Sequence, residues 1–139
     1  FMKNSVLACI FLFSAFVFGQ GKSAVTPKIV VKVPQGETVV LKGVSIKFIE
    51  VLEDSRCPTG VDCIWPGNAK VKTQVTANGN TEEILLTFGE VRQGQEKNTV
   101  LYNAKNFAIN GVKLTPYPTS ETAGKINNYV LLICEEKNN

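Results

Sequence analysis

The chain of 139 residues contains no histidine. Histidine is the most common general base, a member of every Ser-His and Cys-His dyad, and the most common metal ligand. Adjacent carboxylates, such as Glu82 with Glu83 and Glu135 with Glu136, do not replace it, because neighbouring residues of a strand point to opposite faces. We therefore expect a protein that is not an enzyme and that carries no cofactor.

Other residue types are also scarce or scattered. Fifteen basic residues stand against twelve acidic ones, and the basic residues form no cluster of the kind that nucleic-acid binding requires. The chain has only two aspartates, Asp54 and Asp62. Together with Glu53 they offer oxygen ligands for calcium, but their spacing matches no known calcium loop. We expect neither nucleic acid nor a bound metal.

One long apolar run is present, at residues 5–18, preceded by Lys3. Val17 and Gly19 follow the small-residue pattern of a cleavage site, so the sequence predicts a signal peptide at residues 1–19 and a mature chain of residues 20–139 forming a single β domain. A membrane anchor is the alternative, but the run is shorter than the roughly 20 residues that span a bilayer. The mature protein is expected to be secreted, in the periplasm or outside the cell, without a membrane span.

Export makes disulfides possible. Cys57 and Cys63 enclose the turn-forming residues 58–62, and we predict that they form a bridge. Cys134 lies in the apolar segment 130–134 and is predicted to be a buried free thiol. A bridge from Cys134 to either of the other two is the alternative.

The hydrophobic pattern has a period of two almost throughout, and no window of helical length has a period of 3.6. Strand-like segments occur at residues 28–33, 38–42, 44–51, 69–77, 82–88, 99–102, 107–109, 112–115 and 126–135. The alternation slips by one residue at Ile49, which predicts a β-bulge, and Asn-Gly pairs at 78–79 and 110–111 predict hairpin turns. We predict an all-β fold, an antiparallel β-sandwich or Greek-key barrel of about eight strands.

The segment of residues 54–67 is the most unusual part of the chain, because it holds both aspartates, two cysteines and the only tryptophan. We consider Asp54, Arg56, Asp62 and Trp65 as candidate binding residues, with Trp65 as the dominant contact. In the structural alternative, Trp65 plugs one end of the core, and Asp54 pairs with Arg56 or caps the turn.

Residues 54–58, Asp-Ser-Arg-Cys-Pro, and residues 63–69, Cys-Ile-Trp-Pro-Gly-Asn-Ala, carry a resemblance. This block resembles the signature of a group of small secreted or lipid-anchored proteins of Bacteroidetes-type bacteria, and residues 114–118 and 129–131 are similar to that group as well. Pro66 departs from the pattern, where a small residue such as alanine is expected. The resemblance implies export and a β-fold, and it implies no catalytic role.

These observations lead to three functional hypotheses. The first is a secreted, non-enzymatic binding module that contacts a protein, a glycan or a component of the bacterial envelope through the loop of residues 54–67. The second is an extracellular inhibitor, for instance of proteases, that presents the same loop as a rigid wedge. The third is an enzyme of unknown class, whose carboxylates converge from distant strands.

Overall fold

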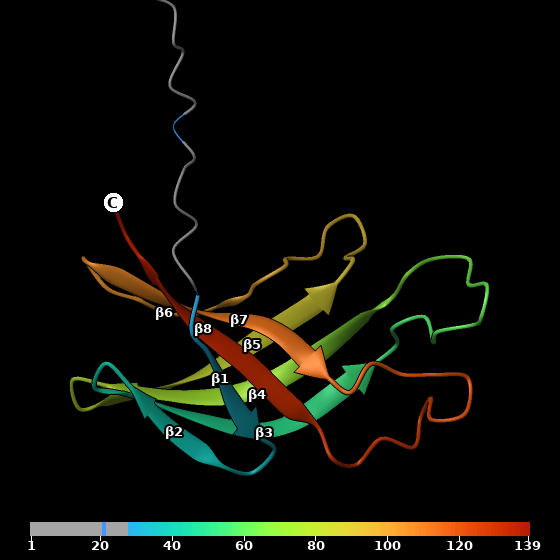
Figure 1. Cartoon of the computed structure of the whole chain (residues 1–139), viewed down its shortest axis with the longest axis horizontal. Helices are drawn as coiled ribbons and strands as arrows, with labels where there is room; N and C mark the ends of the chain where they lie inside the picture. The colour runs from blue at the N-terminus through green and yellow to red at the C-terminus, as the bar shows by residue number, and fades with distance from the viewer. Residues whose placement is uncertain (1–20, 22–27) are drawn as a thin grey trace, which may run out of the picture.

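The computed structural model describes residue 21 and residues 28–139. The predicted signal peptide, residues 1–19, lies outside the described residues. Within the described part the chain forms eight strands and no helix (Figure 1). The strands are β1 (Val30–Pro34), β2 (Thr38–Leu41), β3 (Val44–Asp54), β4 (Asn68–Ala77), β5 (Asn80–Gly89), β6 (Val100–Asn103), β7 (Phe107–Thr115) and β8 (Val130–Lys137). Nothing helical in these residues has the length and apolar character that a membrane crossing requires.

The strands form two antiparallel sheets of four strands each. One sheet has the order β1-β8-β7-β6 and the other has the order β2-β3-β4-β5; in Figure 1, β8 of the first sheet crosses β4 of the second. The predicted all-β fold is therefore confirmed, in the form of a sandwich.

The core lies between the two sheets. In β4, the side chains of Val71, Thr73 and Val75 are buried, whereas Lys70 and Lys72 lie on the outer face and pair with glutamates of neighbouring strands. The same alternation in the other strands fills the core, since one side chain in two points inward. The largest fully buried apolar side chains are Phe48, Ile46, Leu86, Ile109, Leu114, Leu131 and Ile133.

The slip predicted at Ile49 corresponds to a bulge in β3. The pairing of β3 with β4 shifts register between Phe48 and Glu50 and again between Val51 and Glu53. A bulge bends a strand and increases its twist. The end of β3 is therefore bent at the position where the sequence pattern predicts a bulge.

The two Asn-Gly pairs behave differently. Asn78 and Gly79 have positive φ angles of 52° and 76° and connect β4 to β5, so the first hairpin prediction is confirmed. The second prediction, at 110–111, is wrong, because β7 continues through both residues. Gly111 lies beneath a core aromatic side chain, and a Cβ atom there would lie 2.8 Å from Cζ of Phe88. Close packing between the sheets, rather than a turn, accounts for this glycine.

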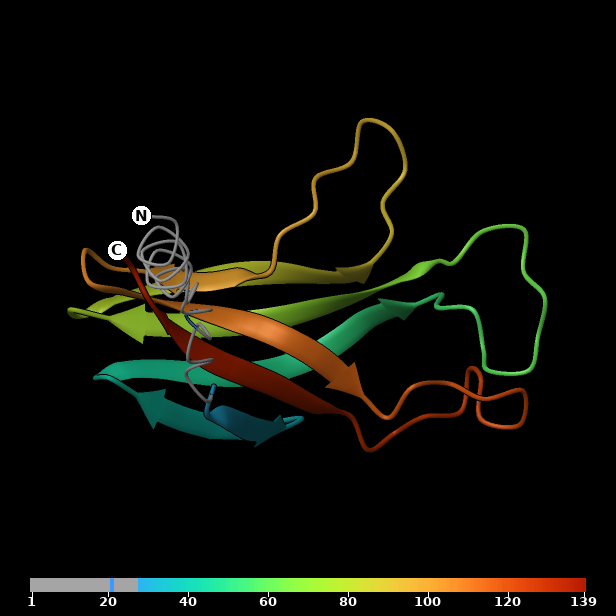
Figure 2. The same ribbon diagram turned by 45° about the horizontal axis from the view of Figure 1, so that its top comes forward.

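Three loops lie at one end of the sandwich. They connect β3 to β4 (residues 55–67), β5 to β6 (residues 90–99) and β7 to β8 (residues 116–129). The pairing of the strand ends places them together: Asp54 is opposite Ala69, and Asn68 is opposite Gly89. Figure 2 shows the first and third of these loops extending side by side from the sandwich. The predicted strand at 126–135 begins only at Val130, which leaves residues 116–129 to the third loop.

Candidate functional site

An ion pair between Asp54 and Arg56 lies at the base of the first loop. The guanidinium of Arg56 donates from Nε to Oδ1 of Asp54 and from a terminal nitrogen to Oδ2, both at 2.7 Å. Both side chains are almost completely buried. The hydroxyl group of Tyr129, in the third loop directly before β8, donates to the same Oδ2 at 2.9 Å. The carboxylate of Asp54 is therefore held from both sheets.

The pKa values of this cluster follow from its contacts. Burial acts to raise the pKa of the Asp54 carboxyl, but the hydrogen bonds from Arg56 and Tyr129 and the guanidinium charge outweigh burial and keep this pKa below its usual range. Burial, together with the hydrogen bond to the Asp54 carboxylate, raises the pKa of Tyr129 to about 12. At neutral pH the cluster thus contains a carboxylate, a guanidinium and a neutral phenol.

Arg56 also binds the loop that follows β7. Its two terminal nitrogens donate to the carbonyl oxygens of Leu114 at 2.8 Å and of Pro116 at 3.1 Å. The guanidinium lies over the ring of Tyr117, 4.9 Å from the ring centre, and the Tyr117 hydroxyl donates to the carbonyl oxygen of Cys57 at 2.9 Å. One arginine on the first loop therefore fastens that loop to the opposite sheet.

The predicted disulfide between Cys57 and Cys63 is confirmed, with the two Cα atoms 5.9 Å apart. Below the bridge, the N–H of Cys57 donates to the carbonyl oxygen of Pro66 at 2.8 Å. Beside it, Thr59 pairs with Thr119 of the third loop in an isolated β-bridge. The first loop is closed on itself and attached to its neighbour.

Gly67 ends the first loop in a position that only glycine fits. Its φ angle is +73°, and a Cβ atom would lie 1.9 Å from the carbonyl oxygen of Ser55. The carbonyl oxygen of Gly67 accepts a hydrogen bond from the N–H of Glu90 at 3.0 Å. The first and second loops are thus joined through backbone groups.

The outermost part of the first loop is exposed and partly apolar. The side chain of Ile64 is fully exposed, and that of Val61 is 44% exposed. Asp62 and Cys63 between them are exposed too. We call residues 61–64 the tip. The tip therefore exposes two apolar side chains next to the disulfide.

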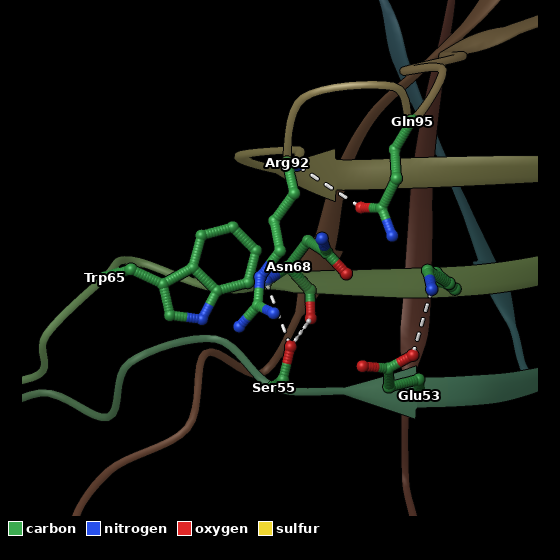
Figure 3. A pocket seen from close by; sticks show the side chains of 7 residues that line it. Glu53, Ser55, Trp65, Asn68, Arg92 and Gln95 are labelled. Atoms are coloured by element: carbon green, nitrogen blue, oxygen red, sulfur yellow. Dashed lines mark hydrogen bonds and ion pairs between the residues drawn. The ribbon is translucent and has the colours of Figure 1, made fainter.

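Trp65 turns away from the tip toward the second loop. The guanidinium of Arg92 lies 4.8 Å from the centre of the indole ring, within the range of a cation–π contact. Figure 3 shows the two side chains against each other beside a shallow hollow of about 250 Å³. The side chains that line the hollow are Glu53, Ser55, Trp65, Asn68, Lys70, Arg92 and Gln95.

The hollow contains an unusual amide, that of Asn68. Its Nδ2 donates to the carbonyl oxygen of Glu90 at 2.7 Å, but its Oδ1 is buried without a hydrogen-bond donor among the described residues. On the other side of the hollow, Lys70 donates to Glu53 at 3.1 Å. The lining therefore combines two cationic side chains with oxygen acceptors.

The structure separates the four candidate binding residues. Asp54 and Arg56 meet each other, as the structural alternative expects, and their groups are occupied by contacts within the protein. Asp62 lies on the exposed tip. Trp65 is half-buried against Arg92 and lines the hollow, so it neither plugs the core nor lies free in solvent.

The sequence does not predict several contacts of this region. Tyr117, Tyr129 and Arg92 stand far along the chain from the residues that they contact. Tyr117 and Tyr129 fall in segments that carry the resemblance, but no local pattern assigns them to the first loop. The position of Tyr117 between Pro116 and Pro118, directly after a strand, is the one clue to a fixed loop aromatic.

The third cysteine, Cys134, is free and buried, as predicted. Burial raises the pKa of its thiol, and the nearby Glu136 carboxylate adds to this effect. Among the residues that the structure describes, no three Asp, Glu, Cys or His side chains lie close enough together to hold a metal ion.

Comparison with protein-family models, with curated proteins and with solved structures gave no match to this chain. The resemblance to small Bacteroidetes-type proteins therefore stays a prediction from the sequence.

Proposed function

We propose that the protein is a secreted, non-enzymatic binding module that contacts a protein, a glycan or an envelope component through its disulfide-tied loop. One observation carries the proposal: Ile64 is fully exposed at the tip of a loop whose base is locked by the buried Asp54–Arg56 pair. Exposing an apolar side chain stabilises nothing in the free protein. Burying it against a partner removes its surface from water, which favours association.

The construction of the loop supports this proposal. Binding costs free energy for every side chain and loop that becomes ordered, and a loop fixed beforehand avoids much of that cost. Here the bridge between Cys57 and Cys63, the contact of Tyr117 with Cys57, and the pairing of Thr59 with Thr119 all restrict the loop. A disulfide persists in oxidising compartments, which agrees with export.

A comparison of tip variants tests the proposal. The mature protein is immobilised and exposed to an envelope extract of the source organism, and the components that it retains are identified. We expect Ile64→Asp to lose specific components, because a charge at the tip cannot be buried without a partner. Val40→Asp is the matched control, since Val40 is 71% exposed on β2, near the other end of the sandwich. Equal retention by wild type, Ile64→Asp and Val40→Asp would refute a role of the tip.

The second candidate is an inhibitor of extracellular proteases. The observation that favours it is the convex shape of the first loop, which extends beyond the sheets as a closed turn (Figure 2). Inhibition of members of a protease panel by the wild type, but not by Ile64→Asp or by the double variant Cys57→Ser/Cys63→Ser, would favour this function over a general binding role. The absence of inhibition across the panel would rule out the inhibitor function.

A further inference from the structure

The hollow beside Trp65 is a second surface, distinct from the tip. It lies at the loop end of the sheet β2-β3-β4-β5, where the first and second loops meet (Figure 3). Six of its seven lining side chains are polar or charged, and the seventh is the indole of Trp65. A small hollow of this composition suits a polar ligand that carries several hydrogen-bonding groups.

The guanidinium of Arg92 is exposed and has donors to spare. It lies 4.8 Å from the centre of the Trp65 ring, whereas the backbone N–H and carbonyl oxygen of Arg92 both pair with Gln95. No carboxylate or carbonyl oxygen of the described residues accepts from its guanidinium. A planar guanidinium matches the two oxygens of a carboxylate. Lys70, on the other side of the hollow, adds a second positive charge. The carboxylate of Glu53 pairs with Lys70 and balances one of the two charges.

Asn68 is an acceptor and therefore requires a hydrogen-bond donor from the ligand. Its side chain is 3% exposed and lines the hollow, and its Oδ1 has no donor among the described residues. A buried acceptor without a donor is unfavourable. Asn68 lies at the wall of the hollow, which is the side from which a ligand would supply that donor (Figure 3). The carboxylate of Glu53, which is half-exposed, is another acceptor on the same surface.

Together, these groups match a ligand that carries one carboxylate with hydroxyl groups around it. We propose that the hollow binds an acidic saccharide through a single uronic acid unit, with the carboxylate on Arg92 and hydroxyl groups donating to Asn68 and Glu53. An acidic peptide supplies the carboxylate, but its donors are mainly backbone N–H groups spaced along the chain rather than hydroxyl groups clustered around the carboxylate. A neutral sugar supplies the hydroxyl groups but leaves Arg92 unpaired. The inference rests on the proposed binding role but uses a surface other than Ile64.

The single tryptophan provides the readout, because its indole N–H gives one signal in a proton–nitrogen spectrum. The ¹⁵N-labelled mature protein is titrated with oligogalacturonate and oligoglucuronate, with maltotriose as the neutral sugar, and with triglutamate as the acidic peptide. We expect the Trp65 indole signal to shift and saturate with at least one uronate and with neither of the other two probes. No response to either uronate, or an equal response to triglutamate, would overturn the proposal.

Two charge-matched variants make the test specific. Arg92→Gln is expected to weaken uronate binding by about tenfold or more, because hydrogen bonds to charged groups are the strongest in such a site. Lys97→Gln removes one positive charge from the same loop but lies outside the hollow, and it should bind as the wild type does. Ile64→Asp should also keep uronate binding, so failure of the tip and failure of the hollow are separate results. Equal weakening by Arg92→Gln and Lys97→Gln would indicate general charge attraction and would overturn the proposal.

Discussion

The carboxylate of Asp54 and the guanidinium of Arg56, two residues apart, form two hydrogen bonds of 2.7 Å within the protein interior. Because Arg56 also binds backbone oxygens beyond β7, this pair connects the end of β3 to the opposite sheet. The exposed tip, only a few residues further along, is held in place by a buried polar cluster. The buried pair at the base of the loop and the disulfide therefore both fix the orientation of the loop.

Breaking the pair at Arg56 should be strongly destabilising. Arg56→Met leaves the Asp54 carboxylate buried without its partner, and removing one member of a buried pair costs about 3–5 kcal/mol. Lys70→Met removes a lysine from an exposed pair with Glu53, and we expect a loss of about 1 kcal/mol or less. Urea unfolding measures both free energies. Equal losses in the two variants would contradict a structural role of the buried pair.

Stability should decrease in acid because of Asp54. A carboxyl group whose pKa is lowered by folding stabilises the folded state fully above its unfolded pKa of about 3.9, and this contribution is lost as the pH falls through the folded pKa. We therefore expect Asp54→Asn to be less stable than the wild type at neutral pH and to lose less stability on acidification. Unfolding free energies between about pH 2 and pH 6 measure this difference.

Glu136 is the matched control for that experiment. A hydrogen bond from Lys28 lowers the pKa of Glu136 as well, but the pair lies at the exposed surface, where such pairs contribute little. Glu136→Gln should leave the acid dependence close to that of the wild type. If Glu136→Gln flattens the curve as much as Asp54→Asn does, the assignment to the buried cluster is wrong.

Two glycines of the first loop should differ in their tolerance of alanine. Gly60 and Gly67 both have positive φ angles, so each alanine variant carries a backbone penalty of about 1–2 kcal/mol. Only Gly67→Ala also places a Cβ atom against the Ser55 carbonyl oxygen, whereas the space around Gly60 is open. We expect Gly67→Ala to be clearly less stable by thermal unfolding. A Gly60→Ala variant of equal or lower stability would argue against the close approach at the loop base.

The contact between Trp65 and Arg92 should be visible in fluorescence. A half-buried indole covered by a guanidinium is partly shielded from water and from quenchers. Arg92→Ala removes that cover, so emission should move to longer wavelength and acrylamide quenching should increase. Lys97→Ala, on the same loop, should leave both unchanged. A spectrum of Arg92→Ala identical to that of the wild type would mean that the contact is absent in solution.

Local sequence patterns predicted most of the sheet structure. The strand-like segment at 69–77 corresponds to β4, in which Val71, Thr73 and Val75 face inward, because the side-chain period of a strand is fixed by its backbone. The turn at Asn78 and Gly79 was predictable for a different local reason, since both residues accept positive φ angles at little cost. The identical pair at 110–111 failed as a turn signal, because Phe88 of the other sheet packs on Gly111.

The candidate site was predictable only in part. The bridge between Cys57 and Cys63 follows from a short turn-forming segment, and the importance of residues 54–67 follows from their composition. The contacts of that loop with distant residues do not follow from the sequence. Tyr117 lies 60 residues after Cys57, and Tyr129 lies 75 residues after Asp54, so these contacts depend on how the sheets stack. Likewise, nothing in a loop without periodicity predicts that Arg92 covers Trp65.

Rigidity of the tip in solution tests the account most directly. Backbone ¹⁵N relaxation of the oxidised protein, residues 20–139, yields order parameters for the amides of residues 57–65, which are compared with those of β4 in the same sample. The account predicts values in the first loop close to the value of about 0.85 that is typical of rigid backbone. Values below about 0.6 across residues 59–64, with β4 rigid, would show a mobile loop and would contradict a preformed recognition surface.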